Sequence, residues 1–234
     1  MDIVSGRLNL NLIGHSPFVH HSGHDSQSWL DCLNHLKAKY PLKLLDCATD
    51  AYITDSRESI CLKDFFQDID KTPSIPPLYV SHVFHKNGDT IDKDLDDLFS
   101  VPECLNNNII KRFRIKRLVA GTKGTGTALH QHSRAYFCNI SGLKRWFLAK
   151  PTQHNNDLLA AFSYDLKQRP IVSISQWFYC QSFDLVDSLE DACIIDLKAG
   201  ESLFIPDGFH HAVLNLSTSI GVAFSWEHQF QHIT

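Results

Sequence analysis

Histidines occur in two short groups that could together bind one metal ion. His130 and His132 are separated by one residue, and His210 and His211 are adjacent about eighty residues later. Side chains two residues apart on an extended strand point the same way, so His130 and His132 can contact a single ion. A histidine from a second strand would complete the site. Three protein ligands leave coordination positions open for substrate or oxygen, as is typical of a catalytic metal centre.

The region around these histidines has the pattern of a β-barrel. From about residue 112 onward, short segments with period-2 alternation are separated by turn signals. The predicted strands are Phe113–Ala120, Thr127–His132, Ala135–Ile140, Lys144–Ala149, Ser182–Val186, Ala192–Leu197, Ser202–Ile205, His211–Asn215 and Ser219–Trp226. An amphipathic segment at about His154–Leu166 predicts one helical insertion. The pattern therefore predicts a mainly β fold, a jelly roll of the cupin type, whose mouth suits a metal and a small molecule.

The first hundred residues differ in texture from this β region. Apolar residues recur at helical spacing at about Ser26–Tyr40, Ile60–Ile69 and Asp89–Phe99, and Pro76–Phe84 predicts a strand. These segments indicate an N-terminal α/β flank beside the barrel.

We expect the chain to form one structural unit with four parts. A flexible or poorly defined segment spans 1–24, and a helix-rich flank spans 25–110. The β domain spans 111–228, and a short tail spans 229–234.

Composition limits the classes of function. The chain has 234 residues, 43% of them hydrophobic, and a net charge of −4, which predicts a packed core and no strong nucleic-acid signature. The basic segment Lys111–Arg117 is interpreted as a strand with alternating solvated charges. Seven cysteines without a CxxC motif favour reduced thiols and a cytoplasmic location, with a nuclear one as the alternative. No secretion signal or membrane span is expected, since no apolar run approaches about 20 residues.

Three segments resemble, in order and spacing, motifs of the jumonji-C (JmjC), or cupin-like, family. They are Gly124–His130, Ile140–Leu148 and Ala199–Leu216, and the resemblance covers about residues 76–228. It implies a double-stranded β-helix that binds Fe(II) and 2-oxoglutarate. The small stand-alone members of the family are mostly hydroxylases of proteins or tRNA, so the resemblance implies a dioxygenase of the hydroxylase type.

The resemblance also implies roles for individual residues. His130 matches the first metal ligand of the family and His211 the distal ligand, with His132 in the second ligand position. Thr127 and Lys144 match residues that bind the carboxylate of 2-oxoglutarate, and Asn139 could supply a further polar contact. A buried lysine is physically sensible there, because a dianion that enters a narrow barrel needs a fixed cation.

The sequence departs from the family pattern at two positions near the metal. His132 stands where most members have an aspartate or glutamate, and Ser225 stands where many have an asparagine. A subset of small jumonji proteins also has His-x-His, and the chain resembles that subset most closely. Three neutral imidazoles leave the ion one charge unit more positive than two histidines and a carboxylate. This disfavours oxidised iron, and an all-nitrogen site also suits zinc and copper.

Three hypotheses about function remain open on the sequence alone. The leading one is an Fe(II)- and 2-oxoglutarate-dependent oxygenase that hydroxylates a protein side chain, with tRNA or a small molecule as alternative substrates. The second is a non-catalytic binding or scaffold protein of the same fold, with a structural or vestigial metal such as zinc. The third is a cupin dioxygenase that does not use 2-oxoglutarate.

Other polar residues near these motifs are interpreted as structural. His210 should point away from His211 on a strand and pack against neighbouring residues. Asp207, within Pro-Asp-Gly, is a turn residue. The remaining histidine group, in the polar N-terminal stretch, is interpreted as a solvated loop; it comprises His15, His20, His21 and His24.

Overall fold

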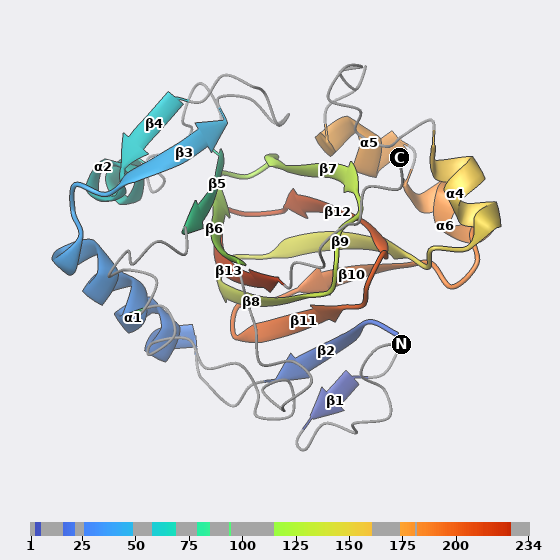
Figure 1. Ribbon diagram of the computed structural model, residues 1–234, viewed down its shortest axis with the longest axis horizontal. Coiled ribbons are helices and arrows are strands. Elements are labelled where there is room, and N and C mark those ends of the chain that lie inside the picture. The colour runs from blue at the N-terminus through green and yellow to red at the C-terminus, as the bar shows by residue number, and fades with distance from the viewer. Residues whose placement is uncertain are drawn as a thin grey trace, which may run out of the picture.

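The two sheets of a β-sandwich make up most of the computed structural model (Figure 1). The structure describes residues 3–5, 16–21, 26–48, 58–68, 79–84, 94, 115–160, 174–180 and 182–225. All strand pairs within the sheets are antiparallel except the first two strands of the chain, which are parallel. The predicted mainly β, cupin-type jelly roll is confirmed.

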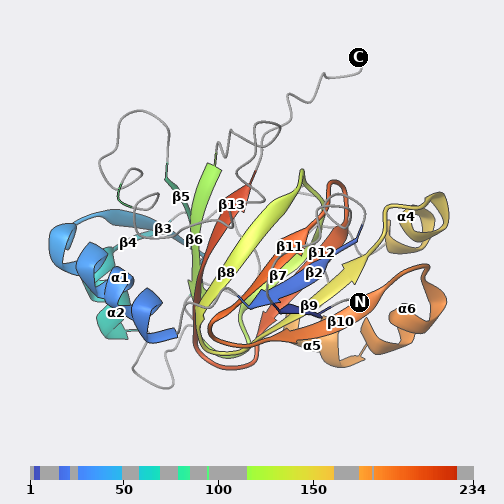
Figure 2. The same ribbon diagram turned by 90° about the horizontal axis from the view of Figure 1, so that it is seen from below.

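The larger sheet has nine strands. In spatial order they are β1 (Ile3–Ser5), β2 (Phe18–His21), β11 (Glu201–Ile205), β8 (Ala135–Ser141), β13 (Ser219–Ser225), β6 (Ile115–Gly121), β5 (Tyr79–Phe84), β3 (Leu44–Ala48) and β4 (Glu58–Cys61). The smaller sheet has four strands, in the order β10 (Cys193–Leu197), β9 (Lys144–Ala149), β12 (His210–Asn215) and β7 (Gly126–His130). Figure 2 shows the two sheets edge-on, with helices at both ends of the sandwich.

The larger sheet is covered on both faces. Between the sheets, Phe137, Trp146, Leu148 and Leu203 belong to one apolar cluster. On the outer face, helices α1 (Ser26–Lys39) and α2 (Leu62–Asp68) pack apolar side chains against the sheet. Strand β8 consequently has no fully solvated face, and its first six residues are all buried.

Three short helices lie on the side of the molecule opposite α1 and α2 (Figure 1). They are α4 (Gln153–Leu159), α5 (Ile174–Cys180) and α6 (Ser182–Ser188). The Thr152 hydroxyl caps α4 by accepting a hydrogen bond from the backbone N–H of Asn155 at 3.2 Å. Trp177 and Phe178 of α5 pack with residues of the smaller sheet. Among the described residues, no helix is long and apolar enough to cross a membrane.

The predicted strand Ser182–Val186 is wrong, because this segment forms α6. Leu185 and Val186 of α6, and Leu189 directly after it, pack into the apolar cluster of the smaller sheet, and the spacing of the three is helical. The buried Ser182 hydroxyl also donates to the Phe178 carbonyl at 2.8 Å. A five-residue alternation was too short to separate the two possibilities.

The loop predicted for the N-terminal histidines is also wrong for His20 and His21, which lie in β2. This strand pairs with β11, and Phe18 stacks on Phe204 with ring centroids 5.0 Å apart. His20 Nδ1 lies 3.0 Å from the hydroxyl of Tyr136. His15 and His24 lie outside the described residues, as does the predicted helix Asp89–Phe99 apart from Asp94.

Gly126 lies at the start of β7, where the strand passes very close to β12. A methyl group added there would lie 1.9 Å from the carbonyl oxygen of Val213, and backbone cannot yield without separating the strands. Gly126→Ala is therefore expected to lower the free energy of unfolding by about 3 kcal/mol, as measured by urea denaturation. The exposed Lys123→Ala should change it by less than about 0.5 kcal/mol. Equal stability of both variants would contradict this close approach.

Candidate metal centre and its cavity

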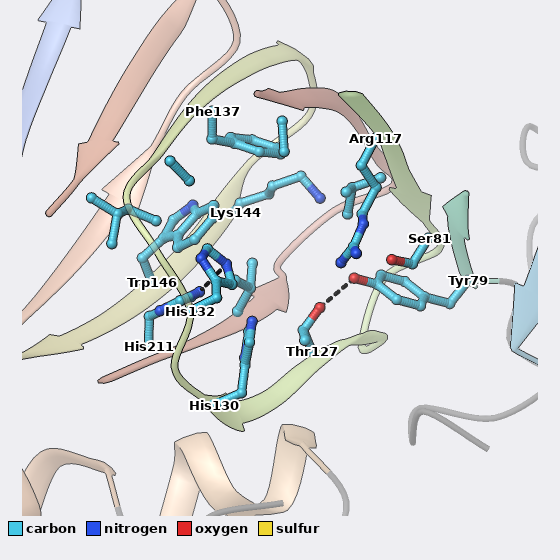
Figure 3. Close-up of a pocket in the computed structure, with 15 residues that line it drawn as sticks. Tyr79, Ser81, Arg117, Thr127, His130, His132, Phe137, Lys144, Trp146 and His211 are labelled. Atoms are coloured by element: carbon cyan, nitrogen blue, oxygen red, sulfur yellow. Dashed lines mark hydrogen bonds between the residues drawn. The ribbon is translucent and has the colours of Figure 1, made fainter. Parts of the chain in front are cut away.

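His130, His132 and His211 converge at one end of the smaller sheet (Figure 3). His130 ends β7 and pairs across the sheet with His211 of β12, while His132 lies just after β7. The ring centroid of His211 is 4.1 Å from that of His130 and 4.5 Å from that of His132. One potential ligand atom from each of the three residues lies within 4.8 Å of the others. The three residues can therefore hold a metal ion together.

The backbone orients all three imidazoles in the same way. His130 Nδ1 lies 2.8 Å from the Ala128 carbonyl oxygen, and His211 Nδ1 lies 2.9 Å from that of Phe209. His132 Nδ1 lies 2.5 Å from the Ser133 carbonyl oxygen. Since a carbonyl oxygen only accepts, each Nδ1 carries the proton and each Nε2 has a free lone pair. This is the outer-shell arrangement expected of metal-binding histidines.

Two of these lone pairs face each other at short range, because the Nε2 atoms of His132 and His211 are only 3.1 Å apart. Two neutral acceptors at that distance repel unless a cation lies between or beside them. Burial lowers the pKa of His130 to about 4, with a further contribution from the charge of His132. Burial also lowers the pKa of His132 and, well below its usual value, that of His211. The histidines are therefore neutral near pH 7 and available as ligands.

The histidines open into a small cavity of about 60 Å³. It is lined by Tyr79, Ser81, Arg117, Val119, Thr127, His130, His132, Ala135, Phe137, Lys144, Trp146, Ile205, His211, Val213 and Ala223. Besides the neutral histidines, these residues include one arginine, Arg117, and one lysine, Lys144, and no aspartate or glutamate. The cavity is thus electrostatically suited to an anion.

Lys144, at the start of β9, is fully buried in the wall of this cavity. Its Nζ donates a hydrogen bond to Asn215 Oδ1 at 2.6 Å and lies 5.6 Å from the centroid of the Phe137 ring. Burial lowers the pKa of Lys144 to about 7. A buried ammonium whose partner is a neutral amide is costly, and an anionic ligand would offset that cost.

A directed chain of hydrogen bonds fixes the amide of Asn215. The Thr125 hydroxyl donates to the Thr122 carbonyl at 2.7 Å, so its oxygen is left to accept from Asn215 Nδ2 at 2.9 Å. The amide oxygen of Asn215 must then face Lys144. Thr125, Lys144 and Asn215 are all at most 1% exposed, so this chain holds the ammonium in place without neutralising it.

Three hydroxyl side chains line the same cavity, those of Ser81, Thr127 and Tyr79. Thr127 of β7 and Tyr79 of β5 are hydrogen-bonded through their side-chain oxygens (Figure 3). Burial raises the pKa of Tyr79, so its hydroxyl keeps its proton at neutral pH. Thr127 was predicted to lie in the site. Tyr79 was not, because a contact between residues 48 positions apart leaves no spacing signal in the sequence.

Asn139, predicted to be near the cosubstrate, is not among the residues that line the cavity. Its Nδ2 donates to the carbonyl oxygens of Gly142 and Leu197 at 3.0 and 3.1 Å. These bonds commit the amide to the backbone at the far end of β8, away from the histidines.

The solvated-charge interpretation of Lys111–Arg117 is wrong for its last two residues. Lys116 is only 4% exposed, and Arg117 is half-buried and lines the cavity. On strand β6, Arg117 and Val119 face the cavity, whereas Leu118 and Ala120 belong to the apolar cluster that includes residues of α1 and α2. Residues 111–114 lie outside the described part of the chain.

The two residues interpreted as structural lie as expected. His210 is buried and points away from the cavity, with Nε2 2.6 Å from Asn156 Oδ1 of α4. Asp207 lies in the turn before β12, where its carboxylate accepts hydrogen bonds from the backbone and the guanidinium of Arg134.

Comparison with known proteins agrees with this architecture. The cupin-like domain family matches residues 20–232. The 2-oxoglutarate and iron-dependent oxygenase JMJD4 of Mus musculus is 23% identical over 214 residues, which cover 82% of this chain and 48% of the relative. Its counterpart in Danio rerio is 33% identical over 111 residues, or 45% of this chain and 25% of the relative. The arginine-specific demethylase JMJ22 of Arabidopsis thaliana is 28% identical over 172 residues, covering 69% and 33%.

The chain spans about half, or less, of the length of these curated relatives. The family match nevertheless extends over both sheets and over the three histidines. The chain therefore belongs to the cupin-like domain family of the jumonji-C type.

Proposed function

We propose that the protein is an Fe(II)- and 2-oxoglutarate-dependent oxygenase that hydroxylates its substrate. The observation that carries this proposal is the combination, in one acid-free cavity, of three neutral histidines with free Nε2 lone pairs and a fully buried lysine. The overall reaction converts substrate R–H, 2-oxoglutarate and O₂ into R–OH, succinate and CO₂. The names of the relatives from mouse and zebrafish support the same cofactors.

The donor atoms fit iron. His130, His132 and His211 would hold the ion through their Nε2 atoms, and their Nδ1–H groups would remain bonded to backbone carbonyls. Imidazole is a good ligand for Fe(II), and three protein ligands leave positions open for the cosubstrate and oxygen. The bound metal supplies the site at which oxygen is activated; the protein orients the ligands and limits access of water.

The rest of the cavity fits 2-oxoglutarate. The Lys144 ammonium would bind the carboxylate that is distant from the metal, with the Thr127 and Tyr79 hydroxyls as additional donors. Asn215 fixes the position of the ammonium through a hydrogen bond, and its neutral amide leaves the charge available to the ligand. Phe137 and Trp146 add apolar surface to the wall of the cavity.

Anaerobic titration of the protein with Fe(II) and 2-oxoglutarate tests this proposal. A metal-to-ligand charge-transfer band and succinate formation after admission of oxygen are the expected results. Absence of both signals from protein that binds Fe(II) would contradict the proposal.

His132, which replaces the usual carboxylate ligand, favours one alternative function, that of a non-catalytic protein with bound zinc. Metal analysis of the purified protein separates the two, because tightly held zinc without oxygen consumption would support the alternative. His132→Asp adds the usual carboxylate. If it creates succinate release in a protein that otherwise lacks it, the histidine is what prevents turnover.

We further propose a protein side chain as the substrate. Support comes from relatives whose printed names describe an arginine-specific demethylase and a histone demethylation protein. The cytoplasmic or nuclear location stays a prediction; in the structure, no disulfide joins Cys32, Cys61, Cys138, Cys180 and Cys193.

The affinity for 2-oxoglutarate is expected to fall as the pH rises above about 7. The pKa of Lys144 is lowered to about 7, so the free protein loses the charge of this ammonium above that pH. The 2-oxoglutarate dianion binds the protein in which Lys144 is protonated. Each further pH unit should weaken binding by up to about tenfold. The unliganded protein should show the opposite trend in stability, since its unfolded state binds the extra proton between that pKa and the ordinary value of 10.5.

Calorimetric titration of 2-oxoglutarate into Mn(II)-loaded protein at several pH values would measure this dependence. Lys144→Arg, whose side chain keeps its charge, should flatten the profile. A wild-type profile that is flat above neutral pH would contradict the assignment of the lowered pKa.

A further inference from the structure

The cavity contains a second cation, Arg117, that the binding of 2-oxoglutarate does not require. Arg117 lies on β6, where it pairs with Val83 of β5 and Ala223 of β13. Its side chain extends into the cavity with the guanidinium directed toward the Tyr79 hydroxyl (Figure 3).

Among the residues that the structure describes, no carboxylate forms an ion pair with Arg117. No residue that lines the cavity is acidic. Burial lowers the pKa of this guanidinium, yet an arginine stays charged at any physiological pH. Five N–H donors on a half-buried, charged group favour an anion that accepts two of them at once.

When 2-oxoglutarate is bound as proposed, neither of its carboxylates is assigned to Arg117. One carboxylate of the dianion faces the metal and the other faces Lys144. In the usual ligand set, an acid beside the metal could offset a neighbouring arginine, but His132 stands there and is neutral. No anion of the filled site is therefore assigned to Arg117, whose guanidinium is directed toward the Tyr79 hydroxyl (Figure 3).

We propose that Arg117 binds a carboxylate of the molecule that is oxidised, so that the substrate is an acidic group. That group is either an aspartate or glutamate side chain of a protein or the carboxylate of a free acid. The inference rests on the proposed function and names the substrate class for that same site.

Small carboxylates and their uncharged isosteres can test this proposal. The probes are the N-acetyl, N-methylamide derivatives of aspartate and glutamate, those of asparagine and glutamine, and propionate as a free acid. The protein is loaded with Mn(II) and with N-oxalylglycine, an inert analogue of 2-oxoglutarate. Binding is read from the broadening of the probe's proton NMR lines by the paramagnetic ion.

The acidic probes should be broadened and the amide probes should not. Arg117→Met should weaken binding of the acidic probes by about tenfold or more, the range expected when a charged hydrogen-bond partner is lost. Arg117→Lys should retain part of the binding. Arg145→Met removes the same charge from an arginine that pairs with Asp196 on the outside of the sheet, and it should bind the probes like the wild type.

Binding of N-oxalylglycine in the same samples separates this inference from the proposed function. Arg117→Met should bind the analogue as the wild type does. If Arg117→Met weakens the binding of the analogue as much as Lys144→Met does, Arg117 binds the cosubstrate. The inference is then wrong, while the proposed function stands. Equal broadening of the acidic probes and the amide probes by the wild-type protein would also overturn the inference. Broadening of propionate but not of the capped amino acids would support it for a free acid. Failure of the wild type to bind Mn(II) and the analogue would overturn the proposed function itself.

Discussion

Lys144→Met is expected to weaken the binding of 2-oxoglutarate by about 100-fold or more, because a buried charge partner is lost. Lys144 is fully buried and is hydrogen-bonded to a neutral amide. Water cannot replace the ammonium at that position. Calorimetry with Mn(II)-loaded protein would measure the loss.

The same variant should change the free energy of unfolding only slightly. Removing a cation whose burial lowers its pKa to about 7 relieves a desolvation cost. The amide oxygen of Asn215 loses its donor, which costs about 1–3 kcal/mol in the opposite direction. Urea denaturation would show whether these two effects nearly cancel. Binding within a few-fold of the wild type, in a variant that is equally stable, would contradict the role of Lys144.

His211→Ala is expected to lower the affinity for Fe(II) or Mn(II) by at least about 100-fold, since loss of even an outer-shell partner costs 10–100-fold. His211 contributes one of two Nε2 atoms only 3.1 Å apart, and no other described imidazole can reach the same position. Competition with a chromophoric chelator would measure the affinity.

His210→Ala is the matched control for that variant. His210 is the neighbouring residue on β12 and is similarly buried, but it bonds to α4 on the other side of the sheet. It should lose stability and keep its metal affinity. Equal loss of metal affinity in both variants would mean that folding, rather than coordination, is being measured.

The sequence predicted the barrel well where strand alternation and turn residues agreed. Eight of the nine predicted barrel strands have counterparts, and the histidine pair and Lys144 lie where their motifs placed them. The exception, Ser182–Val186, forms a helix because its apolar contacts come from the neighbouring α5 and the smaller sheet. Strand β2 was missed because its pairing with β11 joins segments about 180 residues apart, which no local pattern reports.

The site was predicted less completely, for a related reason. Arg117 alternates with apolar neighbours in the manner of a half-exposed strand, but its strand lies inside a nine-stranded sheet that has helices on one face and the cavity on the other. Tyr79 reaches the cavity from β5, outside every motif. Asn139, expected near the cosubstrate, instead bonds through its amide to the backbone carbonyls of Gly142 and Leu197, contacts that no motif reports. The spacing of residues along a strand predicts which face a side chain is on, but not which residues from other elements it contacts.

Among the described strands, β7 forms one edge of the smaller sheet, and its sole partner there is β12. An ion held by His130 and His211 would therefore join the outermost strand to its neighbour through coordinate bonds as well as backbone hydrogen bonds. Metal loading should suppress local opening of this edge and slow amide hydrogen exchange along β7 more than in β8 at the centre of the larger sheet. The exchange rate of a single strand would then report the metal occupancy of the protein.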